Sequence, residues 1–399
     1  MFTLDNSKIL KIIGRENYLF INDFIEYDVP TLIRNASFLV IGGAGSIGAA
    51  TVKEIFKHHP KVLHVIDINE NNLAELVRDI RSSIGYIEGD FKTYVIDTGS
   101  DIFEKFIEEQ CSYDYILNFS ALKHVRSEKD IYTLMRMIEV NILNVIKTLK
   151  KASSKGVKRY FTVSTDKSTN PVNMMGASKR IMEISLLMFK DKIKINTSRF
   201  PNVAFSDGSL LCSFINRILK GQPLVFPKDV MRYFISPYEA SLLCLISCTT
   251  GQNAELFIPK IEQRLPLTSF AEIAEKFLNH LGFELYICNS EEEARNLAPT
   301  LPAKGKWACY ISQTDTTGEK EQEEFYTDSD LIDWTRYKDI GVTELSFKGN
   351  QELLEKFLSE LERMRKRKEW TKSELVNLFK EILPEFDHFE TYRYLDDKM

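Results

Sequence analysis

The stretch SFLVIGGAGSIG, residues 37–48, decides the fold. Its apolar first half is typical of a strand buried on both faces, and the helical spacing of AATVKEIFKHH follows at 49–59. Between them lies a G-x-x-G-x-x-G turn. Its glycines let the backbone turn sharply and approach a pyrophosphate, which then rests on the N-terminus of the helix. The residues predicted to line this dinucleotide site are Gly42, Gly45, Ser46, Ile47 and Gly48.

Predicted strands and helices alternate through the residues that follow this turn. The alternation predicts an α/β fold with a doubly wound, mostly parallel sheet of the Rossmann type. The expected strands are VLHVIDI (62–68), KTYVID (92–97), YDYILNFSA (113–121) and KRYFTVST (158–165). The expected helices are NLAELVRDIRSSI (72–84), IFEKFIEEQ (102–110) and a long helix through about Ser154 that Gly156 closes.

Four segments are expected along the chain. Residues 1–35 are predicted to form a short helix and a connector, and residues 36–200 the dinucleotide-binding domain. After about Asn202 the alternation weakens and proline-containing loops lengthen, which indicates a smaller substrate-binding lobe over 201–345, interleaved with the sheet. Residues 346–399 are expected to be a helical tail, whose second helix has Thr371 at or near its N-cap and stops before Pro384.

Composition excludes several classes of protein. The sum of 52 basic and 57 acidic residues gives a net charge of −5, which argues against a chain that binds nucleic acid over its whole surface. No apolar run is long enough to span a bilayer, and the N-terminus does not resemble a secretory signal. The six cysteines are scattered without a CxxC pair. This usage indicates a reducing cytoplasm and argues against disulfides or a zinc site.

Two acidic residues at strand ends bear on the cofactor. Asp67 closes the second predicted strand, where the ribose-binding acid of a dinucleotide site belongs. A carboxylate there repels a 2′-phosphate, so we expect NAD rather than NADP. Asp97, at the end of the third predicted strand, either bonds the adenine or caps the next helix. A glycine turn that merely packs tightly is the alternative to the dinucleotide site as a whole.

An acid–base set is predicted at the carboxyl end of the strand 158–165. Thr165, Asp166 and Lys167 end that strand, and Lys179 follows inside the next predicted helix. Open α/β sheets bind their ligands at this edge. A hydroxyl, a carboxylate and two ammonium groups beside a cofactor form a candidate catalytic set. A salt-bridged strand end is the structural alternative.

These motifs resemble the extended short-chain dehydrogenase/reductase superfamily. More narrowly, the chain is similar to the nucleotide-sugar 4,6-dehydratases that act on UDP-N-acetylglucosamine in bacterial glycan biosynthesis. The matching stretches are IGREN (13–17), GGAGSIG (42–48), DINENNLAELVRDIR (67–81), SALKHV (120–125), STDKSTNPVNMMGASKR (164–180), RFPNVAFSDGSL (199–210), MRYF (231–234) and GEKEQEE (318–324). The resemblance implies a homo-oligomer that holds NAD tightly and recycles it while it makes a 4-keto-6-deoxy sugar.

The chain departs from the superfamily pattern at two positions. The usual Tyr-x-x-x-Lys is Met175-x-x-x-Lys179 here, so the common phenolic base is missing. The larger members that retain the C5 configuration are similar in having Met at this position, whereas small inverting members keep Tyr. Pro201 replaces a usual Gly, which leaves the sugar specificity open.

The resemblance also implies a role for each site residue. Thr165 would hydrogen-bond the C4 oxygen, and Asp166 would take the C4 hydroxyl proton and later protonate the departing C6 hydroxyl. Lys167 would remove the C5 proton, which requires a lowered pKa. Lys179 would bind the nicotinamide ribose.

Further residues are implied in binding alone. Ser120 and Ala121 would line the cofactor, whereas Lys123, His124, Asn202 and Arg232 would hold the sugar nucleotide, with Asn202 and Arg232 at its diphosphate. A packing role for His124 and a surface ion pair for Arg232 are the alternatives.

Three other functions stay open. The same dehydration could act on a GDP- or dTDP-linked sugar, and a C4 epimerase would share the fold. A non-catalytic protein that binds NAD or a sugar nucleotide is the third, since fold alone does not fix function.

Overall fold

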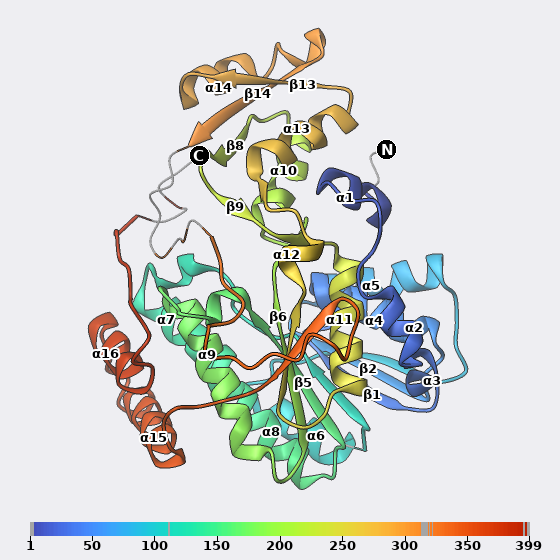
Figure 1. The fold of residues 1–399 in the computed structure, drawn as a ribbon, viewed down its shortest axis with the longest axis vertical. Coiled ribbons are helices and arrows are strands. Elements are labelled where there is room, and N and C mark those ends of the chain that lie inside the picture. The colour runs from blue at the N-terminus through green and yellow to red at the C-terminus, as the bar shows by residue number, and fades with distance from the viewer. Residues whose placement is uncertain are drawn as a thin grey trace.

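The centre of the molecule is an eight-stranded sheet in the order β15-β11-β6-β5-β4-β1-β2-β3 (Figure 1). The computed structural model describes residues 4–110, 112–312, 318, 320, 322–393 and 396. Only β15 runs antiparallel to its neighbour, and the other paired strands of this sheet are parallel. The predicted doubly wound sheet is therefore confirmed. Its strands are β1 Ser37–Ile41, β2 Val62–Asp67, β3 Asp90–Val95, β4 Tyr115–Asn118, β5 Arg159–Thr165, β6 Lys194–Phe200, β11 Glu255–Pro259 and β15 Ile340–Glu344.

Helices cover both faces of this sheet. The helix α4 (Ser46–Lys57) packs against α11 (Pro237–Thr250) on one face, and α6 (Asp101–Gln110), α8 (Asn144–Ser154) and α9 (Met174–Leu186) lie on the other. The helix α5 (Glu70–Ser83) packs on β3. The long helix predicted to end near Ser154 is divided, since α7 (Ile131–Ile138) meets α8 through a π-helical turn at Glu139–Leu143.

The N-terminal segment differs from its prediction. Instead of one helix and a connector, the chain forms α1 (Asn6–Ile12), α2 (Ile21–Glu26) and α3 (Val29–Arg34). Pro30 lies in the first turn of α3, where its missing N–H has no helical partner to lose. Phe20, Phe24, Val29 and Ile33 are buried in the main core, so tertiary packing stabilises helices this short.

A smaller lobe lies beyond the carboxyl ends of the sheet strands (Figure 1). Its three-stranded sheet has the order β13-β14-β8, and Phe214, Phe226 and Phe234 are buried in its core. Two short strand pairs, β9–β12 and β7–β10, form separate two-stranded sheets. The elements are β7 Asn202–Val203, α10 Leu210–Leu219, β8 Leu224–Pro227, β9 Met231–Arg232, β10 Phe234–Ile235, α12 Ile261–Arg264, β12 Thr268–Ser269, α13 Phe270–His280, β13 Glu284–Cys288, α14 Glu291–Leu297 and β14 Lys306–Ser312.

The C-terminal tail contains α15 (Gln351–Arg367) and α16 (Lys372–Ile382). Both pack on α7 and α9 through a separate apolar cluster. Thr371 is the N-cap of α16 and forms a capping box with Glu374, and the helix ends before Pro384. These boundaries confirm the prediction for this helix. They were predictable because the residues that cap the helix are close together in the sequence.

Candidate active site

A cavity of about 650 Å³ opens at the carboxyl ends of the central strands, between the sheet and the lobe. Strands from the middle of the sheet and loops from the lobe contribute its walls. The predicted site residues that line it are Gly42, Gly45, Ser46, Ile47, Gly48, Ala121, Lys123, His124, Thr165, Asp166, Lys167, Met175, Lys179, Asn202 and Arg232. The fold therefore brings together most of the residues singled out from the sequence.

The glycine turn leaves no space for side chains. Gly42 has a φ of +70°, and a Cβ added there would lie 2.7 Å from the amide nitrogen of Ser120. A Cβ on Gly48 would lie 2.2 Å from the carbonyl oxygen of Gly42. Gly45 is the N-cap of α4 and provides no side-chain cap, so the first amides of α4 are available to a phosphate. This arrangement fits a dinucleotide.

Three predicted cofactor residues lie outside the cavity walls. Asp67 ends β2 as predicted, and its carboxylate accepts a hydrogen bond from the amide of Ala44 at 3.0 Å. Ser120 contributes its backbone to the close packing at Gly42. The placement of Asp97 at the end of a strand is wrong, because β3 stops at Val95.

Beyond β3, the Asp97 carboxylate stabilises the turn that leads into α6. It accepts a hydrogen bond from the amide of Gly99 at 2.9 Å and forms an ion pair with Arg136 at 2.8 Å. A side chain engaged in this way is part of the local turn, which strand periodicity could not predict.

A buried acid–base cluster lies at the end of β5. The Thr165 hydroxyl donates to Oδ1 of Asp166 at 2.8 Å, and Nζ of Lys167 lies 3.1 Å from the same oxygen. Nζ of Lys167 is also 3.1 Å from Oε1 of Glu323, which in turn lies 3.7 Å from Nη2 of Arg232. Asp166 and Glu323 are 2% and 6% exposed, so water screens these charges little.

The lowered pKa predicted for Lys167 is wrong. Burial alone lowers the pKa of this ammonium group, but the carboxylates of Asp166 and Glu323 outweigh burial and raise the pKa above its usual range. The pKa of the Asp166 carboxyl is raised as well, because the effect of burial outweighs the opposing effect of Lys167. Both groups therefore hold their protons more tightly in the free protein than they would in water.

Lys179 is the group whose proton is loosely held. Its Nζ donates to the carbonyl oxygen of Val163 at 2.9 Å, and burial lowers its pKa to about 8. Met175, 3% exposed, presents an apolar side chain to the cavity where the superfamily has a phenol. The described residues at this position therefore offer no hydroxyl base.

The predicted substrate residues lie on the lobe side of the cavity. Burial lowers the pKa of both Lys123 and His124, and Nζ of Lys123 lies 3.4 Å from Oγ of Ser206. Nδ2 of Asn202 is buried and has no hydrogen-bond partner among the described residues. Arg232 is buried at 6% exposure, so the alternative of a surface ion pair is wrong: its ion pair with Glu323 lies inside the protein.

Sequence reasoning missed two acidic residues of this site. Glu323 lies in the quoted stretch 318–324, but four of the seven residues there are glutamates and a loop has no periodicity to say which one faces inward. Glu183, on α9, is fully buried behind the cluster. It accepts hydrogen bonds from Ser164 and Ser168 and from the Arg199 guanidinium, at distances of 2.6 to 2.9 Å.

A sequence profile described as polysaccharide biosynthesis protein matches residues 38–344, more than half of the chain. The chain belongs to this family. The match begins at β1 and ends at β15, so it covers the sheet, the lobe and every cavity residue except Arg393.

The chain is similar to relatives with different descriptions. An uncharacterized membrane protein of Methanocaldococcus jannaschii is 35% identical over 64% of this chain and 74% of its own length. The capsular polysaccharide biosynthesis protein CapD of Staphylococcus aureus is 28% identical over 63% of this chain and 42% of its own. A UDP-glucose 4-epimerase of Rickettsia bellii is 27% identical over 56% and 66%. The chain thus spans about two fifths of the length of CapD.

Solved structures share the fold. The protein Pen from Bacillus thuringiensis superposes with a TM-score of 0.65 at 20% identity, over 80% of this chain and 90% of its own. The dTDP-glucose 4,6-dehydratase DesIV from Streptomyces venezuelae superposes with a TM-score of 0.54 at 18% identity, over 73% and 88%. In the part of this polysaccharide biosynthesis protein that the structure describes, none of the helices has the length and apolar character to cross a membrane.

Proposed function

We propose that this protein is an NAD-dependent nucleotide-sugar 4,6-dehydratase that converts UDP-N-acetylglucosamine to a UDP-4-keto-6-deoxy-N-acetylhexosamine. The observation that carries the proposal is the set of Thr165, Asp166, Lys167 and Glu323, with both carboxylates buried, on the wall of a cavity that also reaches the glycine turn. Loss of water across C5 and C6 needs an acid for the oxygen and a base for the carbon proton. An acid and a base in contact beside a dinucleotide site meet both requirements.

The cofactor proposed is NAD, held at the glycine turn and the N-terminus of α4. Bound there, NAD would accept a hydride from C4 of the sugar and return it to C6. The Asp67 carboxylate at the end of β2 favours NAD over NADP, because it would repel a 2′-phosphate. A cofactor restored in each cycle needs no exchange, so we expect it to stay bound through purification.

Asp166 is the proposed carrier of the hydroxyl proton. With Thr165 it would take the proton from the C4 oxygen as the ketone forms, and would later give that proton to the C6 oxygen as water leaves. Burial raises the pKa of Asp166, which favours the protonated form that the second step requires. The carboxylate is regenerated when the water departs, so the group completes its cycle unchanged.

Lys167 is the proposed base at C5. Because neighbouring carboxylates raise its pKa, it must first release its own proton, and Oε1 of Glu323 lies 3.1 Å from its Nζ to receive it. The amine would then take the C5 proton, which the C4 ketone makes acidic. Return of that proton to C5 from the same nitrogen restores it on the same face, so we propose retention of configuration. This assignment agrees with Met175 in place of Tyr.

The remaining cavity residues would bind the sugar nucleotide. Arg232 and the unpartnered amide of Asn202 suit the diphosphate, because both offer N–H donors from a buried wall. Lys123 and His124 would lie along the sugar. NAD and nucleotide sugars are cytoplasmic metabolites, so we place the proposed reaction there.

The decisive experiment is mass spectrometry of UDP-N-acetylglucosamine incubated with the purified protein and no added cofactor. A product lighter by one water would support both the dehydration and the retained NAD, and proton NMR would then define C5. The similarity to UDP-glucose 4-epimerases makes epimerisation the second candidate, and it would leave the mass unchanged. No new product from UDP-, GDP- or dTDP-linked sugars, either by mass or by proton NMR, would refute the enzyme.

A further inference from the structure

The last part of the chain returns to the cavity from the outside. After α16 the backbone runs along the loop that precedes α9: the amide of Asp387 donates to the carbonyl of Pro171 at 3.2 Å, and that of Phe389 to Val172 at 2.9 Å. Four residues later, Arg393 lines the cavity. This segment lies beyond the residues matched by the family profile, so the family match does not account for it.

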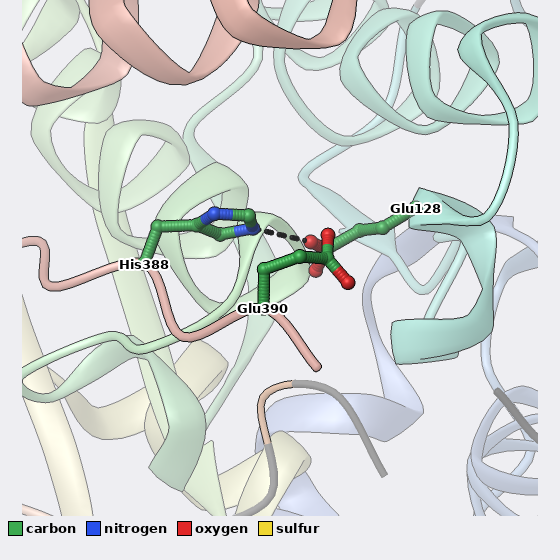
Figure 2. Close-up of side chains that lie close together, drawn as sticks. All are labelled: Glu128, His388 and Glu390. Atoms are coloured by element: carbon green, nitrogen blue, oxygen red, sulfur yellow. Dashed lines mark hydrogen bonds and ion pairs between the residues drawn. The ribbon is translucent and has the colours of Figure 1, made fainter. Parts of the chain in front are cut away.

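A hydrogen bond to a buried carboxylate fixes this segment on one side. Figure 2 shows the ring of His388 pointing at Glu128, with Glu390 beside them. Nε2 of His388 donates to Oε2 of Glu128 at 2.9 Å, while Oε1 of Glu128 accepts the amide of Met174 at 2.7 Å. Glu128 is fully buried, so this contact connects the tail to the first turn of α9.

The same three side chains have the composition of a metal site, since their ligand atoms all lie within 4.8 Å of one another. Their existing partners favour an anchor instead. Both oxygens of Glu128 already accept hydrogen bonds, and Glu390 forms an ion pair with Lys372. We therefore treat the group as the attachment of the tail.

A second contact fixes the segment beyond Arg393. The carboxylate of Asp396 lies 2.5 Å from Nη2 of Arg126 and 2.9 Å from Nζ of Lys129. Arg126 is itself a cavity residue and directly follows Val125 and His124. Arg393 is thus held between two attachments, one at the start of α9 and one at the turn after β4.

We propose that Arg393 is a substrate-recognition residue that binds the sugar part of the nucleotide sugar. The inference rests on the proposed function and extends it. Both attachments adjoin the reacting end of the cavity: α9 carries Met175, and the turn after β4 carries His124. An arginine at this position can donate several hydrogen bonds to hydroxyl and acyl oxygens of the sugar.

The charge of the cavity supports this assignment. Besides Arg393, five cationic side chains line it, against three carboxylates from Asp166, Asp207 and Glu323. The cations are Lys123, Arg126, Lys167, Lys179 and Arg232. Such a positive excess suits a substrate with a diphosphate, and a cation at the sugar end adds affinity for the sugar that free UDP cannot use.

The test compares calorimetric binding of UDP-N-acetylglucosamine and of UDP to the NAD-loaded protein and its variants. Arg393→Gln should weaken binding of the sugar nucleotide by about 10- to 100-fold and leave UDP binding unchanged, because a hydrogen bond to a charged group is lost only at the sugar. The matched control is Arg363→Gln on α15, whose side chain is 54% exposed and paired with Glu360. It should change neither affinity.

The outcomes separate this inference from the proposed function. Equal weakening of UDP and UDP-N-acetylglucosamine, or no weakening of either, overturns the sugar-binding role of Arg393. If Arg393→Gln lowers the melting temperature, Arg393→Lys replaces it, since a lysine keeps the charge but not the planar set of donors. A wild-type protein that binds the sugar nucleotide more tightly than UDP yet forms no product would refute the dehydratase and leave this inference standing.

Discussion

Replacing Glu183 with Gln tests whether the buried ion pair behind the catalytic strand stabilises the fold. Glu183 is fully buried, and its two oxygens accept Nε and Nη2 of Arg199 at 2.9 and 2.8 Å. Burial by itself raises the pKa of this carboxyl, but the charges of Arg199 and Arg180 outweigh it and lower the pKa from 4.5 to about 2. At about 1.4 kcal/mol for each pKa unit, that difference corresponds to about 3 kcal/mol of stability at neutral pH.

The free energy of unfolding of Glu183→Gln should be lower than that of wild type by at least this amount. A glutamine keeps the shape but leaves the Arg199 guanidinium, 4% exposed, without a countercharge, and breaking a buried pair in this way costs about 3 to 5 kcal/mol. Urea unfolding followed by circular dichroism at pH 7 measures the loss. The control is Glu360→Gln, which removes an exposed ion pair with Arg363 and should leave the midpoint unchanged.

The dependence on pH has a definite sign. A carboxylate with a lowered folded-state pKa stabilises fully above its unfolded value of 4.5, and the stabilisation is lost as the pH falls from there toward about 2. The difference in free energy of unfolding between wild type and Glu183→Gln should therefore stay constant from pH 7 to 5 and become smaller below pH 4.5. A gap that closes near pH 6, or a midpoint for Glu183→Gln equal to that of Glu360→Gln, would refute the reasoning.

Three further predictions concern the site itself. Gly48→Ala should purify without NAD, because its Cβ would lie 2.2 Å from the carbonyl oxygen of Gly42; a normal 260 nm absorbance from bound dinucleotide would contradict this. Asp166→Asn should lower kcat by about 10²- to 10⁴-fold while NAD content stays normal, and a variant with more than a tenth of wild-type turnover would exclude Asp166 as the acid. Binding of NAD to the apoprotein should weaken about tenfold between pH 7 and 9 as Lys179, whose pKa burial lowers to about 8, loses its proton; a flat titration would contradict this.

Features set by adjacent residues were predictable from the sequence. The glycine turn, the strand that ends at Thr165 and the N-cap at Thr371 each depend on neighbours within a few positions, and the structure has all three. The short N-terminal helices were missed because their stability comes from packing on the main core rather than from a long periodic stretch. Likewise, the turn at Asp97 could not be predicted, because a turn has no repeating pattern of apolar residues.

Long-range contacts were not predictable, and the pKa of Lys167 is the clearest case. The sequence led us to expect a lowered pKa, and burial does act in that direction. The opposite shift arises from the adjacent Asp166 carboxylate and from Glu323, which the chain brings back from beyond the lobe to within 3.1 Å of Nζ. Of these two contributions, only that of Glu323 comes from a distant part of the chain. Arg393 is similar: contacts of the tail with Val172 and Arg126 put it at the cavity, and neither contact has a local signature.

The distant carboxylate changes what the catalytic cluster can do. Asp166 and Glu323 carry two negative charges, and Lys167 and Arg232 carry two positive ones, so the charges of the four side chains sum to zero. Moving a proton from Lys167 to Glu323 keeps that sum at zero, which avoids the large cost of creating a net charge away from water. One neutral cluster can therefore supply the acid for C6 and the base for C5 without exchanging protons with solvent. If so, deuterium from heavy water should enter C5 of the product more slowly than product forms, and complete exchange in each turnover would show that solvent reaches the base.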